Sequence, residues 1–148
     1  MNELRRAVDS FATFIRGLPP HLLQPSHIAE WGPLEVLCHL AFWHEQYVAI
    51  LEAIQDGREP PLINGTFKSI NASAVAAHLA TPPAELVHKL EKAQDSLERI
   101  TGNPDAETLA FSFRKGSKVW PLPKAIELIA GHISLHEKRL HHSPRASS

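Results

Sequence analysis

Residues 31–57, WGPLEVLCHLAFWHEQYVAILEAIQDG, contain the longest stretch of the chain that no proline or glycine interrupts. Gly32-Pro33 marks the start of a helix, because proline is favoured at the first helical position. Asp56-Gly57 marks its end. Apolar residues point in almost every direction around this helix, so we expect it to be buried on most sides. They are Leu34, Val36, Leu37, Leu40, Phe42, Trp43, Tyr47, Val48, Ile50, Leu51 and Ile54.

Three further segments show the spacing of apolar residues that is typical of amphipathic helices. The first covers residues 4–18 and ends at Pro19-Pro20. The next opens at Thr81 before two prolines and closes at Gly102. The last begins among the prolines at 121–123 and continues through Leu140.

The connections between these segments differ in length. Residues 58–81 form a long connection in which residues 69–79 predict a short helix. In residues 103–120, the large apolar residues Leu109, Phe111 and Phe113 occupy alternate positions and predict a short extended piece. The sequence therefore predicts an all-α fold, an antiparallel four-helix bundle with a long crossing connection between helices two and three. We assign residues 1–142 to this domain and residues 143–148 to a flexible tail.

Composition excludes several classes of function. The chain has 148 residues and a formal net charge of −1, so it has no basic field for nucleic acid or an anionic membrane. No stretch approaches the roughly 20 apolar residues that cross a bilayer, and nothing resembles a signal peptide. A single cysteine, Cys38, gives no sign of a disulfide framework. We expect a cytoplasmic protein that acts on a small molecule.

The spacing of three histidines predicts a metal site. His132 and His136 are four residues apart and therefore lie on one face of the last helix, within its apolar stripe. His39 shares its face of the 31–57 helix with apolar residues, so all three should point at the bundle core. Three imidazoles can hold one divalent metal and leave positions open for water or substrate. Nitrogen ligands suit Zn, Ni, Fe or Cu alike. The alternative is three separately hydrogen-bonded core histidines.

The other polar and aromatic candidates have weaker signals. Glu35 lies one turn before His39, where it could orient that ring or act as a base, or be an ordinary exposed residue. Cys38 should pack rather than ligate, and Trp43 and Trp120 could wall a pocket or belong to the core or a dimer interface. A second group comprises cations that an anionic substrate could meet, or that simply face solvent: Arg114, Lys115 and Lys118. We expect His44 at the surface or an interface, and no metal role for His21, His27, His78, His88, His141 or His142.

Two motifs carry a resemblance to a known family. WGPLEVLCHLAFW (31–43) looks like the tryptophan, helix start and His-Leu signature of the DinB/YfiT-like superfamily. IAGHISLH (129–136) looks like the H-x-x-x-H that closes that superfamily's metal motif. The resemblance covers nearly the whole chain and implies a four-helix bundle in which His39, His132 and His136 bind a divalent metal. It also implies relatives that use low-molecular-weight thiols such as bacillithiol or mycothiol, and homodimers.

Three functions follow as hypotheses. A bound metal, most simply Zn, Ni or Fe, would activate a thiol in a transferase or a water molecule in a hydrolase, acting on a small electrophilic substrate. The third is a non-catalytic small-molecule-binding or stress-related protein with a structural metal or none. We also expect a twofold homodimer, because the 31–57 helix carries more apolar surface than one core uses. The surface meant is Leu37, Leu40, Ala41, Val48 and Leu51.

Overall fold

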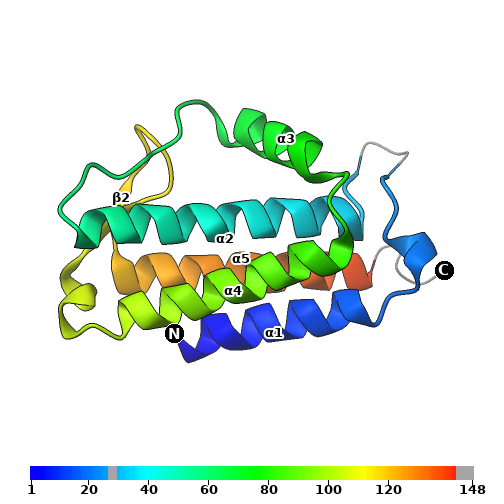
Figure 1. Ribbon diagram of the computed structural model, residues 1–148, viewed down its shortest axis with the longest axis horizontal. Helices are drawn as coiled ribbons and strands as arrows, with labels where there is room; N and C mark the ends of the chain where they lie inside the picture. Colours follow the sequence, from blue (N-terminus) through cyan, green and yellow to red (C-terminus); the bar gives the residue numbers. More distant parts are fainter. Residues whose placement is uncertain (27–29, 143–148) are drawn as a thin grey trace.

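A computed structural model describes residues 1–26 and 30–142, and it confirms the helical bundle (Figure 1). The predicted tail at 143–148 lies outside the described residues. The four long helices are α1 (Asn2–Arg16), α2 (Pro33–Gln55), α4 (Pro83–Thr101) and α5 (Leu122–His141). The connections hold the predicted short helix, α3 (Phe67–His78), and the 3₁₀ turns η1 (Pro20–Leu22) and η2 (Pro104–Thr108). The predicted extended piece is β1 (Ala110–Ser112), which pairs antiparallel with β2 (Val119–Pro121).

The crossing connection sets the directions of the helices. In Figure 1, α2 and α4 run in one direction while α1 and α5 run in the other, because the chain returns along the bundle through α3 before α4 begins. The closest packing is between the parallel neighbours, α2 with α4 and α1 with α5. By contrast, α2 and α5 meet much less closely. One side of the bundle is therefore a loosely packed seam between α2 and α5.

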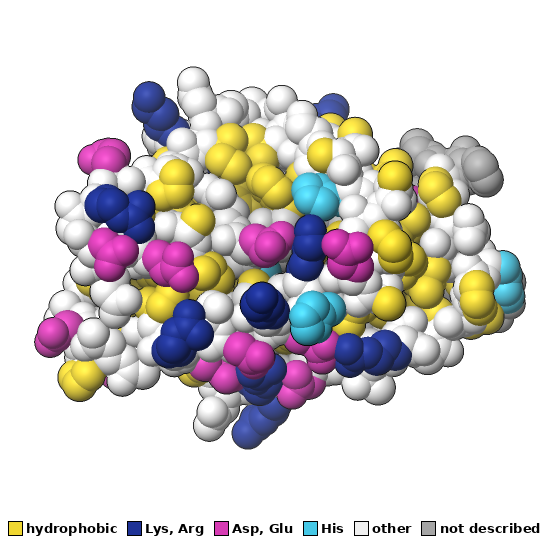
Figure 2. Space-filling model, in the orientation of Figure 1, with side chains coloured by type: hydrophobic (Ala, Val, Ile, Leu, Met, Phe, Trp, Pro, Cys, Tyr) yellow, Lys and Arg dark blue, Asp and Glu magenta, His cyan; other side chains and the backbone are white. Residues whose placement is uncertain are grey.

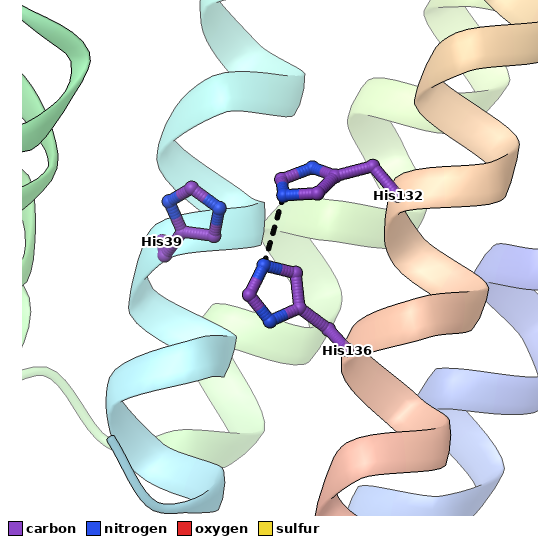
Figure 3. Close-up of side chains that lie close together, drawn as sticks. All are labelled: His39, His132 and His136. Carbon is purple, nitrogen blue, oxygen red and sulfur yellow. Dashed lines mark hydrogen bonds between the residues drawn. The ribbon is translucent and has the colours of Figure 1, made fainter. Parts of the chain in front are cut away.

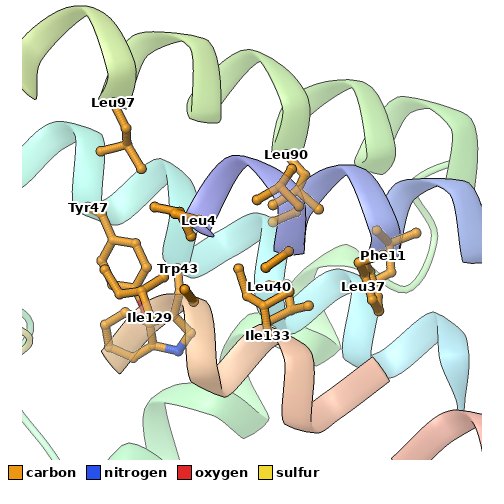
Figure 4. Packing of buried hydrophobic residues seen from close by; sticks show 14 of the residues in the cluster. Leu4, Phe11, Leu37, Leu40, Trp43, Tyr47, Leu90, Leu97, Ile129 and Ile133 are labelled. Carbon is orange, nitrogen blue, oxygen red and sulfur yellow. The ribbon is translucent and has the colours of Figure 1, made fainter. Parts of the chain in front are cut away.

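The core lies between the four long helices, and α2 is its central element (Figure 4). Phe11 of α1 and Leu90 of α4 are among the side chains that fill this core with no exposed surface. Within the chain itself α2 buries Leu37, Leu40, Ala41 and Leu51, which leaves only Val48 of the proposed dimer surface partly exposed. The expectation that α2 carries more apolar surface than one core uses is therefore wrong, because α4 and the core of the same chain cover that surface. The homodimer itself stays a prediction.

The start of α2 is fixed by Glu35. Its Oε1 atom accepts a hydrogen bond from the Gly32 backbone N–H at 2.7 Å, and its Oε2 atom accepts one from the Ser26 N–H at 2.9 Å. A glutamate at the third helical position that bonds back to the N-cap amide is half of a capping box. The carboxylate satisfies backbone donors that a helix start otherwise leaves open. This fixes the position of the first turn of α2, one turn before His39.

The crossing and the hairpin are attached to each other. Thr66 caps α3 by accepting a hydrogen bond from the Ser69 N–H at 3.1 Å. The Lys115 N–H in the hairpin turn donates to the Ile63 carbonyl of the crossing at 2.9 Å. Gly116, with φ of +80°, supplies the left-handed residue that lets this turn close. Two segments that are about fifty positions apart in sequence therefore lie side by side over α2.

The surface carries charges of both signs. Figure 2 shows Lys and Arg side chains interleaved with Asp and Glu on the face that α4 and α1 occupy in Figure 1. Ion pairs join these helices, with Arg5 donating to Glu98 at 2.8 Å and Arg16 donating to Glu91. This face therefore shows no field of one sign that would attract nucleic acid. Within the described residues, no helix is long and apolar enough to cross a membrane.

Candidate metal centre

The three predicted histidines meet across the seam between α2 and α5 (Figure 3). His39 comes from α2, and His132 and His136 come from successive turns of α5. Each ring offers one nitrogen, and these atoms all lie within 4.8 Å of one another. The Nε2 atoms of His132 and His136 are 2.9 Å apart. The prediction that the three rings surround a common point is confirmed.

His39 is the buried member of this triad. Only 3% of its surface is exposed, and neither ring nitrogen meets hydrogen-bond geometry with a partner among the described residues, although the Asn71 side chain lies close enough to oppose the lowering of its pKa. The Trp31 ring packs against it with the centroids 5.1 Å apart. Burial, followed by the neighbouring His136 and His132, lowers the pKa of His39 to about 3. The ring is therefore neutral at ordinary pH and its lone pair is available to a metal.

His132 and His136 do not lie in the core as the helical wheel suggested. His132 is exposed and His136 is half-buried, and their apolar neighbours Leu128 and Leu135 are exposed by 37% and 43%. The residue spacing predicted the correct face of α5, but the loose packing between α2 and α5 leaves that face partly exposed. Partial burial lowers the pKa of both rings, that of His136 to about 4, and nearby Arg139 contributes to both shifts.

These residues fit a divalent metal. Three neutral imidazoles within ligand distance of one another form a nitrogen donor set of the kind that zinc and other late divalent ions prefer. His39 also needs a partner, because a buried polar group without one costs about 1–3 kcal/mol. One ion bound to all three rings would satisfy this requirement, and the exposed side of His132 leaves room for a further ligand.

A cavity of about 320 Å³ opens beside the triad. His39 and His132 form one end, and aromatic rings form most of the remaining wall. The described residues that line it are His39, Trp43, Tyr47, Phe67, Asn71, Phe113, Leu128, Ile129 and His132. None of these carries a carboxylate, an ammonium or a guanidinium group, so the cavity suits a compact, largely apolar molecule.

Sequence reasoning found part of this wall. Trp43 was a candidate and lines the cavity, and Tyr47 follows it by one further turn on the same side of α2. Phe67 and Asn71 of α3 and Phe113 after β1 were missed, because they come from connections whose position over α2 no periodicity reveals. Asn71 is held in place by Trp43, whose indole Nε1–H donates to its Oδ1 atom at 2.5 Å.

Glu35 and Cys38 do not join the site. Both carboxylate oxygens of Glu35 are used at the start of α2, so this residue makes no hydrogen bond to His39. The expectation that it might be an exposed residue is also wrong, since it is 5% exposed. Cys38 is packed in the core as expected, and burial raises the pKa of its thiol to about 11.

His44 corrects another expectation. It is 1% exposed rather than at the surface, and its Nε2 atom is 2.8 Å from Oε1 of the buried Gln94 on α4. The wheel placed it correctly on the side of α2 away from His39, but that side packs against α4 and not against solvent. Two of the histidines for which no metal role was expected form hydrogen bonds away from the triad. His78 bonds to the Ala74 carbonyl and His141 bonds to Glu137. His27 lies outside the described residues.

The cations of the hairpin do not line the cavity. Lys118 lies over the ring of Trp120, with Nζ 4.2 Å from the ring centroid. Neither residue is among those that line the cavity, so Trp120 does not wall the pocket. Arg114 lies over the cavity-lining Phe67, with Cζ 4.7 Å from the ring centroid. Its Nε atom is sealed from solvent and has no partner among the described residues. Arg114 is therefore the hairpin cation that contacts a ring lining the cavity.

Comparison with known proteins gives one consistent result. The family model of the mycothiol maleylpyruvate isomerase N-terminal domain matches residues 4–137. A crystal structure of the mycothiol-dependent maleylpyruvate isomerase matches the fold with a TM-score of 0.73 at 12% identity. A variant of that enzyme with one histidine replaced by alanine matches with a TM-score of 0.72, also at 12% identity.

Both structural matches cover 91% of this chain and 56% of the other, so the chain spans about half the length of these relatives. No curated protein matches this sequence. At such low identity the structures show a shared fold and no more, whereas the family model matches most of the chain. This chain belongs to the mycothiol maleylpyruvate isomerase N-terminal domain family, within the DinB/YfiT-like superfamily.

Proposed function

We propose that this protein binds a divalent metal through His39, His132 and His136 and activates a low-molecular-weight thiol for attack on a small electrophile. One observation carries the proposal: three imidazoles converge on one point at the end of an aromatic cavity, and the buried one has no other partner. The family supports the thiol, because its characterised relative is described as mycothiol-dependent. Since the chain covers only 56% of that relative, neither its substrate nor its whole activity is transferred.

The histidines and the aromatic wall have separate roles in this proposal. A divalent metal bound there would lower the pKa of a thiol or water that reaches it. His39 is held by Trp31 and by the rigid start of α2, so it offers its nitrogen in a fixed position. His132 and His136 form the more exposed side of the centre, from which a thiol can enter. Trp43, Phe67 and Phe113 exclude water from the electrophile.

A thiol is favoured over water as the nucleophile. Hydrolysis at such centres benefits from a carboxylate that accepts the proton of the attacking water. The described lining residues include no Asp or Glu, and Glu35 is committed to backbone amides. Two outcomes then remain for a thiol that forms a bond to an electrophilic carbon. In a transfer the sulfur–carbon bond persists and the thiol is consumed, whereas in an isomerisation it breaks again and the thiol is regenerated.

The first experiment measures metal in protein purified without a histidine tag. We expect about one equivalent of a divalent ion per chain in the wild type and a large loss in His136→Gln. His141→Gln is the matched control, since this residue lies on the same helix, is exposed and binds Glu137 instead. Wild-type protein without metal affinity, or equal metal content in both variants, would overturn the metal site.

The second experiment tests the thiol. The metal-loaded protein is incubated with mycothiol or bacillithiol and a panel of electrophiles that includes maleylpyruvate, and both product and free thiol are counted. Turnover that needs metal and thiol together supports the proposal, and the fate of the thiol separates transferase from isomerase. A protein that retains metal but turns over nothing in the panel would favour the non-catalytic binding protein.

A further inference from the structure

The cavity contains one hydroxyl group that the metal centre does not explain. Tyr47 lines the cavity eight residues after His39, which places its Cα about 12 Å further along α2. Its ring extends from α2 toward α5, beside Trp43 and Ile129 (Figure 4). Contacts with Phe111, Phe113 and His44 hold the ring at centroid distances of 5.9, 5.7 and 5.8 Å. Tyr47 therefore forms the end of the cavity that lies away from the triad.

Among the described residues the hydroxyl of Tyr47 has no hydrogen-bond partner, although Tyr47 is only 6% exposed. The contacts that Tyr47 makes with other described side chains are contacts of its ring, and none is a hydrogen bond of its hydroxyl. Among described residues, the buried side-chain atoms that lack both solvent and partner belong to His39 and Arg114. The Tyr47 oxygen is not one of them, so it keeps a small accessible surface, and the cavity is the open space that Tyr47 is shown to line. Buried tyrosine hydroxyls usually have a hydrogen-bond partner, and a bound ligand would supply one here.

The hydroxyl is a donor in this environment. Burial raises the pKa of Tyr47 well above its ordinary value, so the O–H stays protonated. Asn71, on the same wall, is already engaged. Because an indole N–H can only donate, the atom that receives Trp43 is the amide oxygen of Asn71, and the Asn71 side chain also acts on the His39 ring, where it opposes the lowering of the pKa. The described lining offers no carboxylate acceptor to complement the Tyr47 donor.

We propose that the Tyr47 hydroxyl selects ligands that carry an oxygen acceptor, a carbonyl or carboxylate, at the end of the molecule remote from the metal centre. The unsaturated or aromatic body of the ligand lies between Trp43 and the rings of Phe67 and Phe113. This rests on the proposed function only in taking the cavity ligand to be the electrophilic substrate. Tyr47 is thus a specificity-determining residue, whereas the histidines carry the chemistry.

A pair of isosteric probes tests the assignment without any turnover. Acetophenone and α-methylstyrene have the same shape, but the carbonyl oxygen of the first is a CH₂ group in the second. Binding to the purified protein, with no thiol added, is followed by NMR through the indole N–H of Trp43, assigned with a Trp43→Phe variant. Tyr47→Phe removes only the hydroxyl and keeps the ring. Phe67→Leu is the matched control, which thins the wall without touching a hydrogen bond.

We expect Tyr47→Phe to weaken acetophenone about fivefold, the loss of one neutral hydrogen bond, and to leave α-methylstyrene unchanged. Phe67→Leu should weaken both probes alike. The unchanged binding of α-methylstyrene shows that Tyr47→Phe is folded. The proposal is overturned if Tyr47→Phe affects both probes equally, if it affects neither, or if the wild type binds neither probe. None of these results depends on metal or thiol, so they leave the proposed function to its own tests.

Discussion

Replacing His39 with leucine should stabilise the metal-free protein while destroying its metal site. In the absence of metal, both nitrogens of this 3% exposed ring lack a hydrogen-bond partner within the part of the chain that the structure describes. Leucine has a similar volume and no polar atom to desolvate. A residue whose removal stabilises the fold would be one that the protein keeps for binding and not for packing.

The magnitude follows from burial and from proton linkage. At pH 7, removing the unsatisfied buried group should raise the free energy of unfolding by about 1–3 kcal/mol. The pKa of His39 is lowered from 6.5 to about 3 in the folded state. Between these values only the unfolded chain binds the proton, so the stability of the wild type falls as the pH falls. At pH 5 this costs a further ~2 kcal/mol, which the variant does not lose at this position.

The assay is urea unfolding at pH 7 and pH 5 in the presence of a chelator, with the midpoint compared between variants. His44→Leu is the matched control, because His44 is also buried on α2 and its pKa is lowered to about 4. Unlike His39 it has a partner, the buried Gln94, which the substitution would leave unpaired. His44→Leu should therefore destabilise at pH 7 by about 1–3 kcal/mol, although it gains the same pH trend.

Excess metal should reverse the order of the wild type and His39→Leu. At pH 7, binding to the folded state alone adds about 4.1 kcal/mol at a free metal concentration of about a thousand times Kd, more than the advantage of the variant, and only the wild type has the complete site. The reasoning is refuted if His39→Leu destabilises the chelated protein at both pH values, or if it responds to metal as the wild type does.

Three other predictions can be checked with the same material. His136→Gln should abolish metal affinity in calorimetric titration with only a modest change in melting temperature, and a chelator that unfolds the wild type outright would show that the metal is structural. Glu35→Gln should lower the unfolding free energy by about 2 kcal/mol, since a charged acceptor of two backbone amides is lost, yet leave the metal content unchanged. A loss of metal in that variant would restore Glu35 to the site. A homodimer remains a prediction from the resemblance alone, and a monomeric mass in light scattering at micromolar concentration would count against it.

The candidate metal centre and the cavity beside it are built from different parts of the fold. The three histidines lie on two long helices, whereas three of the nine described residues that line the cavity come from α3 and the hairpin. A backbone hydrogen bond of 2.9 Å between Lys115 and Ile63 joins these two covering segments. Changes in the covering segments could therefore alter which molecule fits the cavity without moving the histidine nitrogens.

The sequence alone determined the helices and the three histidines that come together. Prolines at 33, 83 and 123 and glycines at 57 and 102 stand at helix ends because they fit those backbone positions and interrupt helix interiors. The four-residue spacing of His132 and His136 put two ligands on one face of α5, since a helix turns about 100° per residue. The sequence also contains the signal for the helix cap, because Glu35 stands at the third position of its helix. This role was not predicted from the sequence.

Only the tertiary structure decided what lies opposite each face. Periodicity gives the direction of a side chain around its own helix axis, but not which neighbour occupies that direction or how closely it packs. His44 was expected at the surface and lies against Gln94, while His132 was expected in the core and lies at an open seam. Phe67, Asn71 and Phe113 reach the cavity through a crossing and a hairpin whose placement depends on the packing of the whole chain. Local spacing therefore predicts the histidine triad, whereas the cavity beside it forms only once the connections have folded over α2.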